Sequence, residues 1–362
     1  MARNPYHNLG RKAYWKSALS QDGLPINIYR PKWPILPSDK IMTAGSCFAQ
    51  HIGHQLRRRG FQVLDAEPAP ENLPKQQYGQ FGFGMFSARY GNVYTTRQLL
   101  QLLRESLGLF SPTDAVWQAK DGGFCDALRP SIEPSGFDSE DEVRRHREYH
   151  LRQVRDLMRQ LDVFIFTFGL TEVWEHHPSG TVYPSAPGTI AGSFDPSRHR
   201  FRNLSFSEVL DDFEECRKLI RAQQPNARFL VTVSPVPLAA TATSNHVMVA
   251  TSYSKSTLRS VAGLLADRYD DVDYFPSYEI ITNSWSSTVH YTQNLRDVRP
   301  ESVEHVMATF FAAHAHEPIA PLAPSVRSDS VLDNLEKAED EIVCDEAILA
   351  AFAPPAGAEA TP

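Results

Sequence analysis

Short apolar runs alternate with amphipathic stretches along most of this chain. Residues 163–168 read Val-Phe-Ile-Phe-Thr-Phe, an unbroken apolar run typical of a strand that is covered on both faces. Before it, residues 138–161 place apolar side chains on one side of a helix and arginines on the other, which predicts a long amphipathic helix. Further short strands are expected at 41–44, 61–64, 228–233 and 272–275.

Polar residues mark where several helices begin. Thr95 with Gln98, and Ser205 with Glu208, have the spacing of capping boxes and predict helices that start directly after Thr95 and Ser205. Other helices are expected at 47–59, 253–269 and 300–311. The alternation predicts one three-layer α/β/α domain over residues 35–316, with a central parallel sheet of about five strands.

Composition changes the picture at the two ends. Residues 1–34 are rich in proline and aromatic residues without periodicity, so we expect an ordered lead-in segment. Of the net charge of −7, residues 317–362 carry −8, which leaves about +1 for residues 1–316. We expect this acidic, Ala/Pro-rich tail to be mostly disordered, with room for a short helix at 333–346, and to stay away from the functional site.

Charge and composition also exclude several classes of protein. An electrically balanced body argues against binding to nucleic acid. No apolar run reaches the length of a signal peptide or of a membrane span, and the four cysteines form no CxxC pair, so we predict a cytoplasmic protein with reduced thiols. His176 and His177 lack a third ligand at suitable spacing, which predicts no metal site, and the basic run 144–155 is interpreted as a solvated helix face.

Candidate chemistry lies where polar residues follow apolar runs, because ligands of parallel sheets bind at the carboxyl ends of the strands. Ser46 follows the first strand at the start of a helix, where the helix dipole and free N–H groups stabilise an oxyanion. Ser46 is interpreted either as a nucleophile or as a plain N-cap, and the residues alone favour the cap. Cys47 is interpreted either as a second nucleophile or as a buried thiol, which we favour.

The run Gly45-Ser46-Cys47-Phe48-Ala49 resembles the signature of the GSCFA family, which is similar to the SGNH/GDSL hydrolases and their flavodoxin-like fold. Segments 90–94, 167–174, 233–237, 250–255 and 274–279 also resemble family blocks in family order, so the resemblance covers about 35–316. It implies that Ser46 is the nucleophile and that Gly91, with Asn92 beside it, supplies the oxyanion hole. Thr171 stands where the family pattern of these hydrolases has asparagine, and a hydroxyl can also donate a hydrogen bond.

The sequence departs from this resemblance where a histidine base is expected, before the last helix. Arg299 occupies that place, and an arginine cannot act as a base near neutral pH. The base would then come from elsewhere: His246, in a loop after a strand end, is the first choice, followed by His290 and His305. Glu172 is interpreted as an activating or substrate-binding carboxylate, or as a structural ion-pair partner.

Two functions therefore stay open. The first is a serine-dependent esterase or acyltransferase that acts, without a cofactor, on a small O-acyl ester, expected on a carbohydrate. The alternative is an inactive SGNH-like binding or assembly module, in which Arg299 grips a carbohydrate or anionic ligand. The sequence supports both interpretations of the site and leaves the oligomeric state open.

Overall fold

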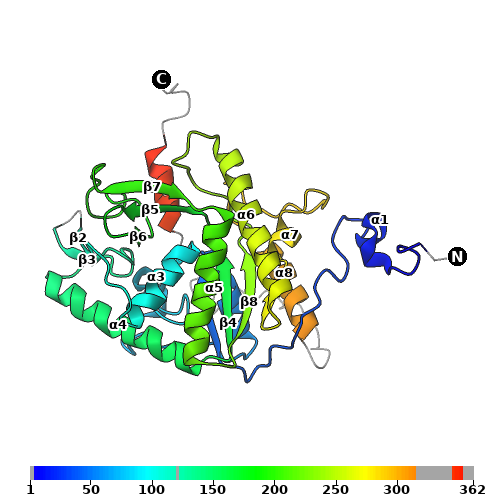
Figure 1. Cartoon of the computed structure of the whole chain (residues 1–362), viewed down its shortest axis with the longest axis horizontal. Coiled ribbons are helices and arrows are strands. Elements are labelled where there is room, and N and C mark those ends of the chain that lie inside the picture. Colours follow the sequence, from blue (N-terminus) through cyan, green and yellow to red (C-terminus); the bar gives the residue numbers. More distant parts are fainter. Residues whose placement is uncertain (1–3, 120–121, 315–344, 354–362) are drawn as a thin grey trace.

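The computed structural model describes residues 4–119, 122–314 and 345–353. At its centre lies a parallel sheet of four strands (Figure 1). Its order is β1 (Ile41–Gly45), β4 (Val163–Phe168), β8 (Arg228–Val233) and β9 (Val272–Tyr274). In the register of the sheet, Ile41 pairs with Val163, and Val163 pairs with Arg228 on the other side. The carboxyl ends of these strands therefore lie at one edge of the sheet, where the sequence places its candidate chemistry.

Helices cover both faces of this sheet. One face carries α2 (Phe48–Arg58), α7 (Ser277–Ile281) and α8 (Pro300–His314). The other face carries α3 (Thr96–Ser106), α4 (Glu140–Gln160), α5 (Phe206–Gln223) and α6 (Val247–Arg268). Side chains of a strand point alternately to its two faces, so one buried strand contributes to both layers. The three-layer α/β/α prediction is confirmed.

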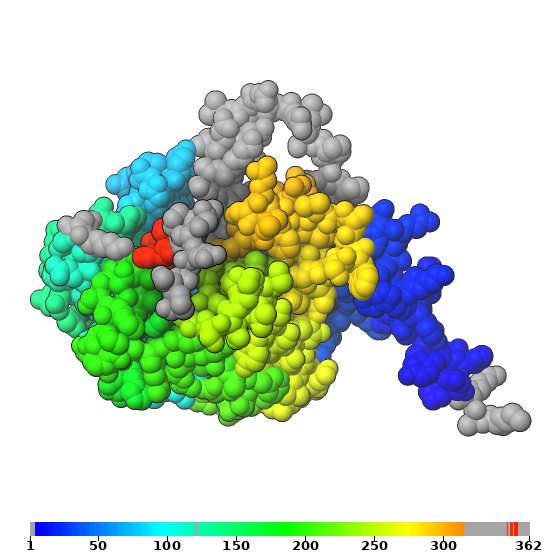
Figure 2. All heavy atoms as spheres, turned by 90° about the horizontal axis from the view of Figure 1, so that it is seen from above, coloured from blue at the N-terminus to red at the C-terminus, as the bar shows by residue number. Residues whose placement is uncertain are grey.

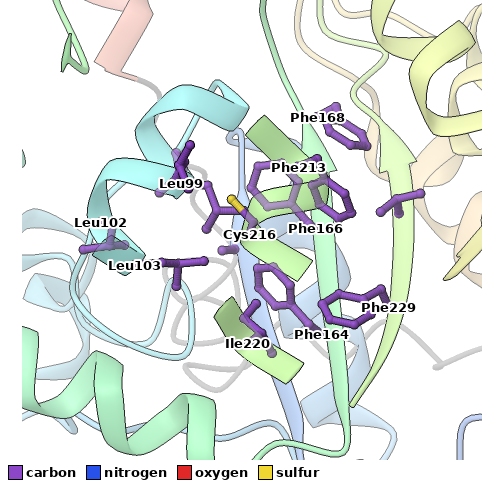
Figure 3. Close-up of a cluster of buried hydrophobic side chains, with 14 of the residues drawn as sticks. Leu99, Leu102, Leu103, Phe164, Phe166, Phe168, Phe213, Cys216, Ile220 and Phe229 are labelled. Atoms are coloured by element: carbon purple, nitrogen blue, oxygen red, sulfur yellow. The ribbon is translucent and has the colours of Figure 1, made fainter. Parts of the chain in front are cut away.

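Strand β4 shows how its uninterrupted apolar sequence serves two cores. Ile165 packs with the α2 and α8 layer, whereas Phe164, Phe166 and Phe168 face the opposite layer. In Figure 3 these phenylalanines lie against leucines of α3 and against Phe213 of α5. All of these strand side chains are buried. Their packing holds β4 in register with β1, so the carboxyl ends of the two strands lie side by side.

The fifth strand predicted at 61–64 is reduced to a single parallel bridge between Val63 and Ile41. The N–H group of Val63 donates to the carbonyl of Phe61, only two residues before it, at 2.9 Å. Such a tight turn bends the backbone away from the extended path that a full strand needs. The sheet therefore ends at β1, with residues 61–64 lying along its edge.

Two small antiparallel sheets were not predicted. β2 (Val116–Gln118) pairs with β3 (Phe124–Asp126), and β5 (Glu172–His176) lies between β6 (Thr181–Tyr183) and β7 (His199–Asn203). Short 3-10 and α-helical turns complete the described chain: η1 (Arg11–Ala13), α1 (Trp15–Ala18), η2 (Lys75–Gln77), η3 (Gly79–Phe81) and η4 (Asp345–Phe352). Most of the tail, including 333–344 of the predicted short helix, lies outside the described residues.

The N-terminal lead-in segment is the last part of the fold to be described. Residues 4–34 hold two short helical turns, η1 and α1, which project beyond the sheet and its helices (Figure 1), whereas Tyr29 and Trp33 pack against the core on the α2 and α8 side. Within the ranges that the structure describes, no helix combines the length and the apolar character needed to cross a membrane.

Candidate active site

Backbone geometry at the end of β1 places Ser46 beside the neighbouring strand β4. Gly45 has φ of 143°, and a Cβ atom there would lie 2.6 Å from the carbonyl oxygen of Thr167, so only glycine fits. The N–H group of Ser46 donates to that same carbonyl at 3.2 Å. Helix α2 then begins at Phe48 with Cys47 as its N-cap residue. Ser46 is therefore held at the positive end of α2, where the sequence placed it.

The hydroxyl of Ser46 does not cap the helix. Its side chain is 2% exposed, and its Oγ atom has no hydrogen-bond partner among the described residues. Buried hydroxyl groups are normally hydrogen-bonded, so an unpaired one requires an explanation, and a catalytic role is one of the recognised explanations. The N-cap interpretation of Ser46 is therefore not supported by the geometry.

A narrow cavity without free volume for a water molecule lies beside this hydroxyl. Its walls come from the ends of β1, β4 and β8, from α6 and from the C-terminal segment: Ser46, Cys47, Tyr94, Gly169, Leu170, Ser234, Val236, Lys255 and Glu346. No histidine is among these lining residues. Cys47 is buried beside Ser46, as expected for the structural interpretation of this thiol.

Gly169 lies between Ser46 and α6 and lines the cavity at Ser46. A Cβ atom on Gly169 would lie 2.9 Å from the Cβ of Ser46 and 2.9 Å from the carbonyl oxygen of Tyr94, so a side chain cannot be accommodated. The N–H groups of Gly169 and Leu170 both donate to that Tyr94 carbonyl, at 3.0 and 2.9 Å. The carbonyl of Gly169 accepts a hydrogen bond from Nζ of Lys255 at 2.7 Å.

Lys255 is the functional candidate that the sequence analysis missed. It lies on α6 with 2% exposure, and burial lowers its pKa to about 8, although the charge of Glu346 opposes this shift. Desolvation favours the neutral amine because a buried charge loses its hydration. A signal was present in the sequence: Lys255 is the charged residue on the mostly apolar stripe of α6 that includes Ala250, Leu258 and Val261 at helical spacing.

Glu346 reaches this cavity from the C-terminal segment. It lies in η4, and its Oε2 atom accepts a hydrogen bond from Nη2 of Arg296 at 2.6 Å. Both side chains are largely buried, at 14% exposure for Arg296 and 11% for Glu346. A second nitrogen of Arg296, Nε, donates to the carbonyl of Pro237 and fixes the guanidinium at the end of β8. The expectation that the acidic tail stays away from the site is wrong.

A larger cavity of about 550 Å³ adjoins the one at Ser46. The two share Tyr94, Leu170 and Glu346 as wall residues. Most of the remaining walls are apolar or aromatic and come from β5, β6, the segment after β8, and η4: Val173, Trp174, Tyr183, Leu238, Ile348, Leu349 and Phe352. In Figure 2, η4 (red) lies at the surface beside the green part of the chain that carries β5 to β7.

None of the predicted oxyanion residues Gly91, Asn92 and Thr171 lines the cavity at Ser46, and the side chains of Asn92 and Thr171 bond to other residues. The loop with Gly91 and Asn92 is tied to β1, because the N–H group of Val93 donates to the carbonyl of Gly45 at 2.8 Å. The amide oxygen of Asn92 accepts from Gln50 at 3.0 Å. Thr171 Oγ1 donates to Asn203 at 2.6 Å, away from the cavity walls at Ser46.

Glu172 lies in the larger cavity rather than beside Ser46. It accepts hydrogen bonds from Thr241 Oγ1 at 2.6 Å and from the N–H group of Ala242 at 3.4 Å. Burial raises its pKa, and these hydrogen bonds act in the opposite direction. Its position fits the predicted substrate-binding carboxylate, although it also anchors the loop after β8.

The predicted histidines and Arg299 are absent from the walls of the cavity at Ser46. His246 is exposed and caps α6 by accepting the N–H group of Met248 at 3.1 Å. His290 is buried against Ser302, and its lowered pKa results first from burial and then from His305 on α8. Arg299 is exposed and donates to the carbonyl of Tyr291. Arg296, three residues earlier, is the arginine that contacts the site.

A second group of buried charges lies on the other side of the Asn92 loop. We call Glu105, Asp126, Arg129 and Arg147 the Asp126 cluster. Asp126 accepts from Arg129 Nε at 2.7 Å and from Arg147 Nη1 at 2.9 Å, and Arg147 also pairs with Glu105. Burial alone would raise the pKa of Asp126, but Arg147 and Arg129 outweigh it and hold that pKa well below its usual range. Arg147 thus belongs to the run interpreted as a solvated face, yet it is buried.

One comparison with known proteins identifies a relationship. The model of a family described as the GSCFA family matches residues 40–310, which include the whole central sheet and all elements around Ser46 except η4. The search of curated proteins gave no significant match. The search of solved structures likewise gave none.

Proposed function

This chain belongs to the GSCFA family, and on that premise we propose that it is a serine-dependent esterase or acyltransferase with Ser46 as the nucleophile and Lys255 as the general base. The observation that carries the proposal is the buried Ser46 hydroxyl, which has no hydrogen-bond partner among the described residues and shares a cavity with a buried lysine. A lysine whose pKa is lowered by burial is partly neutral near pH 8 and can accept a proton.

The proposed reaction proceeds in two halves. Nζ of Lys255 takes the proton of the Ser46 hydroxyl while Oγ bonds to the acyl carbon, and the ester C–O bond then breaks. The departing alkoxide takes the proton from Lys255, which leaves an acyl group on Ser46. Water or a second alcohol then loses its proton to Lys255 and attacks the acyl carbon. The bond between Ser46 Oγ and the acyl carbon breaks, Oγ takes the proton back from Lys255, and the acid or the new ester leaves. Serine and lysine pairs of this kind occur on unrelated folds.

Lys255 is oriented for this role by its own hydrogen bond. As a neutral amine it still donates to the carbonyl of Gly169, and its lone pair remains for the hydroxyl proton. The positive end of α2 favours the negative charge that develops at Ser46 and on the acyl oxygen. A histidine is therefore not required, which accommodates Arg299 at the place where a histidine was expected.

The remaining features of the proposal come from the sequence. We propose a small-molecule or carbohydrate O-acyl ester as substrate, no nucleic-acid partner, no cofactor and a cytoplasmic location. These features follow from charge, composition and the resemblance to hydrolases, and they stay predictions.

A second candidate function is a binding or assembly module without turnover. The specific observation in its favour is that the expected oxyanion donors Ser46 N–H and Thr171 Oγ1 are bonded to Thr167 and Asn203. Under this proposal, Ser46 is a buried remnant, and the larger cavity holds a ligand that is never cleaved.

Labelling with a fluorophosphonate distinguishes the two. We expect one adduct on wild-type protein, mapped by peptide mass spectrometry to Ser46, and no adduct on Ser46→Ala. The matched control Ser252→Ala removes an exposed hydroxyl of α6 and keeps the adduct. If wild-type protein of intact fold stays unlabelled at every pH up to 10, the enzyme proposal is rejected in favour of the binding module.

A further inference from the structure

The carboxylate of Glu346 is the most informative group in the cavity at Ser46. Carboxylates are rarely buried unless they are paired, and this one pairs with Arg296 at 2.6 Å while lining the same cavity as Ser46 and Lys255. A carboxylate is also what remains when an acyl ester is hydrolysed. An acid released at Ser46 would place its charged end in this cavity, beside the positive groups that now face Glu346.

The rest of η4 also resembles a released fatty acid, because apolar side chains follow the carboxylate of Glu346. Behind the carboxylate, the apolar residues Ile348, Leu349 and Phe352 line the larger cavity, and Ile348 and Phe352 keep 37% and 60% of their surface exposed. The segment thus presents an acidic head followed by apolar side chains. The cavity volume of about 550 Å³ lies within the range of roughly 300–1,000 Å³ that small-molecule sites occupy. An acetyl group alone would leave most of this apolar space unused.

We propose that Glu346 is an internal product mimic, that Arg296 binds the carboxylate released from the substrate, and that the larger cavity accepts an apolar acyl chain. This inference rests on the proposed function and narrows its substrate class to esters of acyl groups much longer than acetyl. It assigns Arg296 as a product-binding residue and η4 as a segment that must move aside before a substrate enters.

Contacts at both ends of η4 hold this segment in place. The ion pair with Arg296 anchors the acidic end, and the wall contacts of η4 shield apolar surface at the other end. A ligand that needs the same place competes with this segment, so its apparent affinity falls by the fraction of molecules in which the place is open. Weakening the anchor increases that fraction and leaves the cavity walls outside η4 unchanged.

Binding of decanoate to the full-length protein tests this inference. Decanoate has the carboxylate and an apolar chain, decan-1-ol has the same chain without the charge, and acetate has the charge without the chain. By titration calorimetry, we expect decanoate to bind Glu346→Gln about tenfold or more tightly than wild type. Acetate should bind at least about hundredfold more weakly than decanoate, because each buried CH₂ group adds affinity.

Two further variants locate the contact. Adding Arg296→Gln to Glu346→Gln should lower decanoate affinity about tenfold or more and leave decan-1-ol affinity unchanged, because only the carboxylate needs the guanidinium. The matched control Glu301→Gln removes an exposed carboxylate at the start of α8 and should behave as wild type. If Glu346→Gln fails to fold by circular dichroism, Phe352→Ser at the other end of η4 should raise decanoate affinity in its place.

The outcomes separate this inference from the proposed function. Equal decanoate affinity in wild type and Glu346→Gln, or equal affinity of decanoate and decan-1-ol in Glu346→Gln, would overturn the product-mimic proposal. Labelling of Ser46 at the same rate in both proteins would overturn the covering role of η4 while leaving the nucleophile in place. The expected decanoate pattern without any labelling of Ser46 would instead reject the enzyme and keep the carboxylate site.

Discussion

Two groups of buried charges lie on either side of the Asn92 loop, and they differ in how their charges are paired. In the Asp126 cluster, each arginine faces carboxylate oxygens at hydrogen-bond distance, and the pKa of Asp126 is held far below its usual range. At Ser46, by contrast, Lys255 donates to a neutral carbonyl, and its pKa falls to about 8. The comparison teaches that pairing makes a buried charge structural, whereas burial without close pairing makes it chemically responsive.

Replacing Lys255 should have the largest effect of the variants considered, because it removes the proposed general base. We expect Lys255→Met to lower kcat/KM on an activated ester such as a p-nitrophenyl ester by about 10²- to 10⁴-fold, the usual contribution of a general base. The free energy of unfolding should stay the same or rise, because an apolar side chain replaces a lysine that is costly to bury. Stopped-flow kinetics and urea unfolding measure the two quantities.

The control for this variant is Lys218→Met, which removes a largely exposed lysine of α5. It should keep the activity of wild type. If Lys255→Met instead unfolds at much lower urea while retaining its rate per folded molecule, Lys255 is a structural residue and the contrast disappears.

The opposite result is expected in the Asp126 cluster. Asp126→Asn leaves Arg129 and Arg147 without their shared carboxylate, and breaking a buried pair in this way costs about 3–5 kcal/mol of unfolding free energy. Urea unfolding at pH 7 checks this loss. Below the midpoint of unfolding, the variant should label at Ser46 at the wild-type rate, since neither arginine lines that cavity. A stable Asp126→Asn protein would show that the cluster is not structural.

The smallest effect separates the two arginines near the last helix. Arg299 is exposed, so Arg299→Gln should change kcat/KM by less than about threefold and the unfolding free energy by no more than about 0.5 kcal/mol. Arg296→Gln breaks the pair with Glu346 and should therefore change the rate of Ser46 labelling more than Arg299→Gln does. A larger effect at Arg299 than at Arg296 would restore the role that the sequence gave to Arg299.

Most of the fold was predictable because its signals are local. The run 163–168 became β4, and both predicted capping boxes form, at Thr95 and at Ser205. The strand at 61–64 failed because a hydrogen bond over two residues bends it. The short strands β5 to β7 carry mixed polar sequences that have no clear period, so periodicity could not reveal them.

The site was less predictable because its parts meet only in three dimensions. Ser46 was placed by the glycine-serine turn and the following helix, and the structure holds it there. Lys255 and Glu346 come from distant parts of the chain. The buried stripe of α6 points to Lys255, but nothing in local spacing tells that tail carboxylate from a solvated one. The choice of His246 as base followed from its place after a strand end, but the loop carries it to the exposed end of α6.

The pH dependence of Ser46 labelling in wild-type protein tests the central claim most directly. Because Lys255 must be neutral to accept the hydroxyl proton, the rate should be low at pH 6, rise through a midpoint near the pKa of about 8 and level off above it. In Glu346→Gln the midpoint should move to lower pH, since the charge of Glu346 raises that pKa. A midpoint near 6.5 that persists in Lys255→Met would contradict the account and assign the base to a histidine.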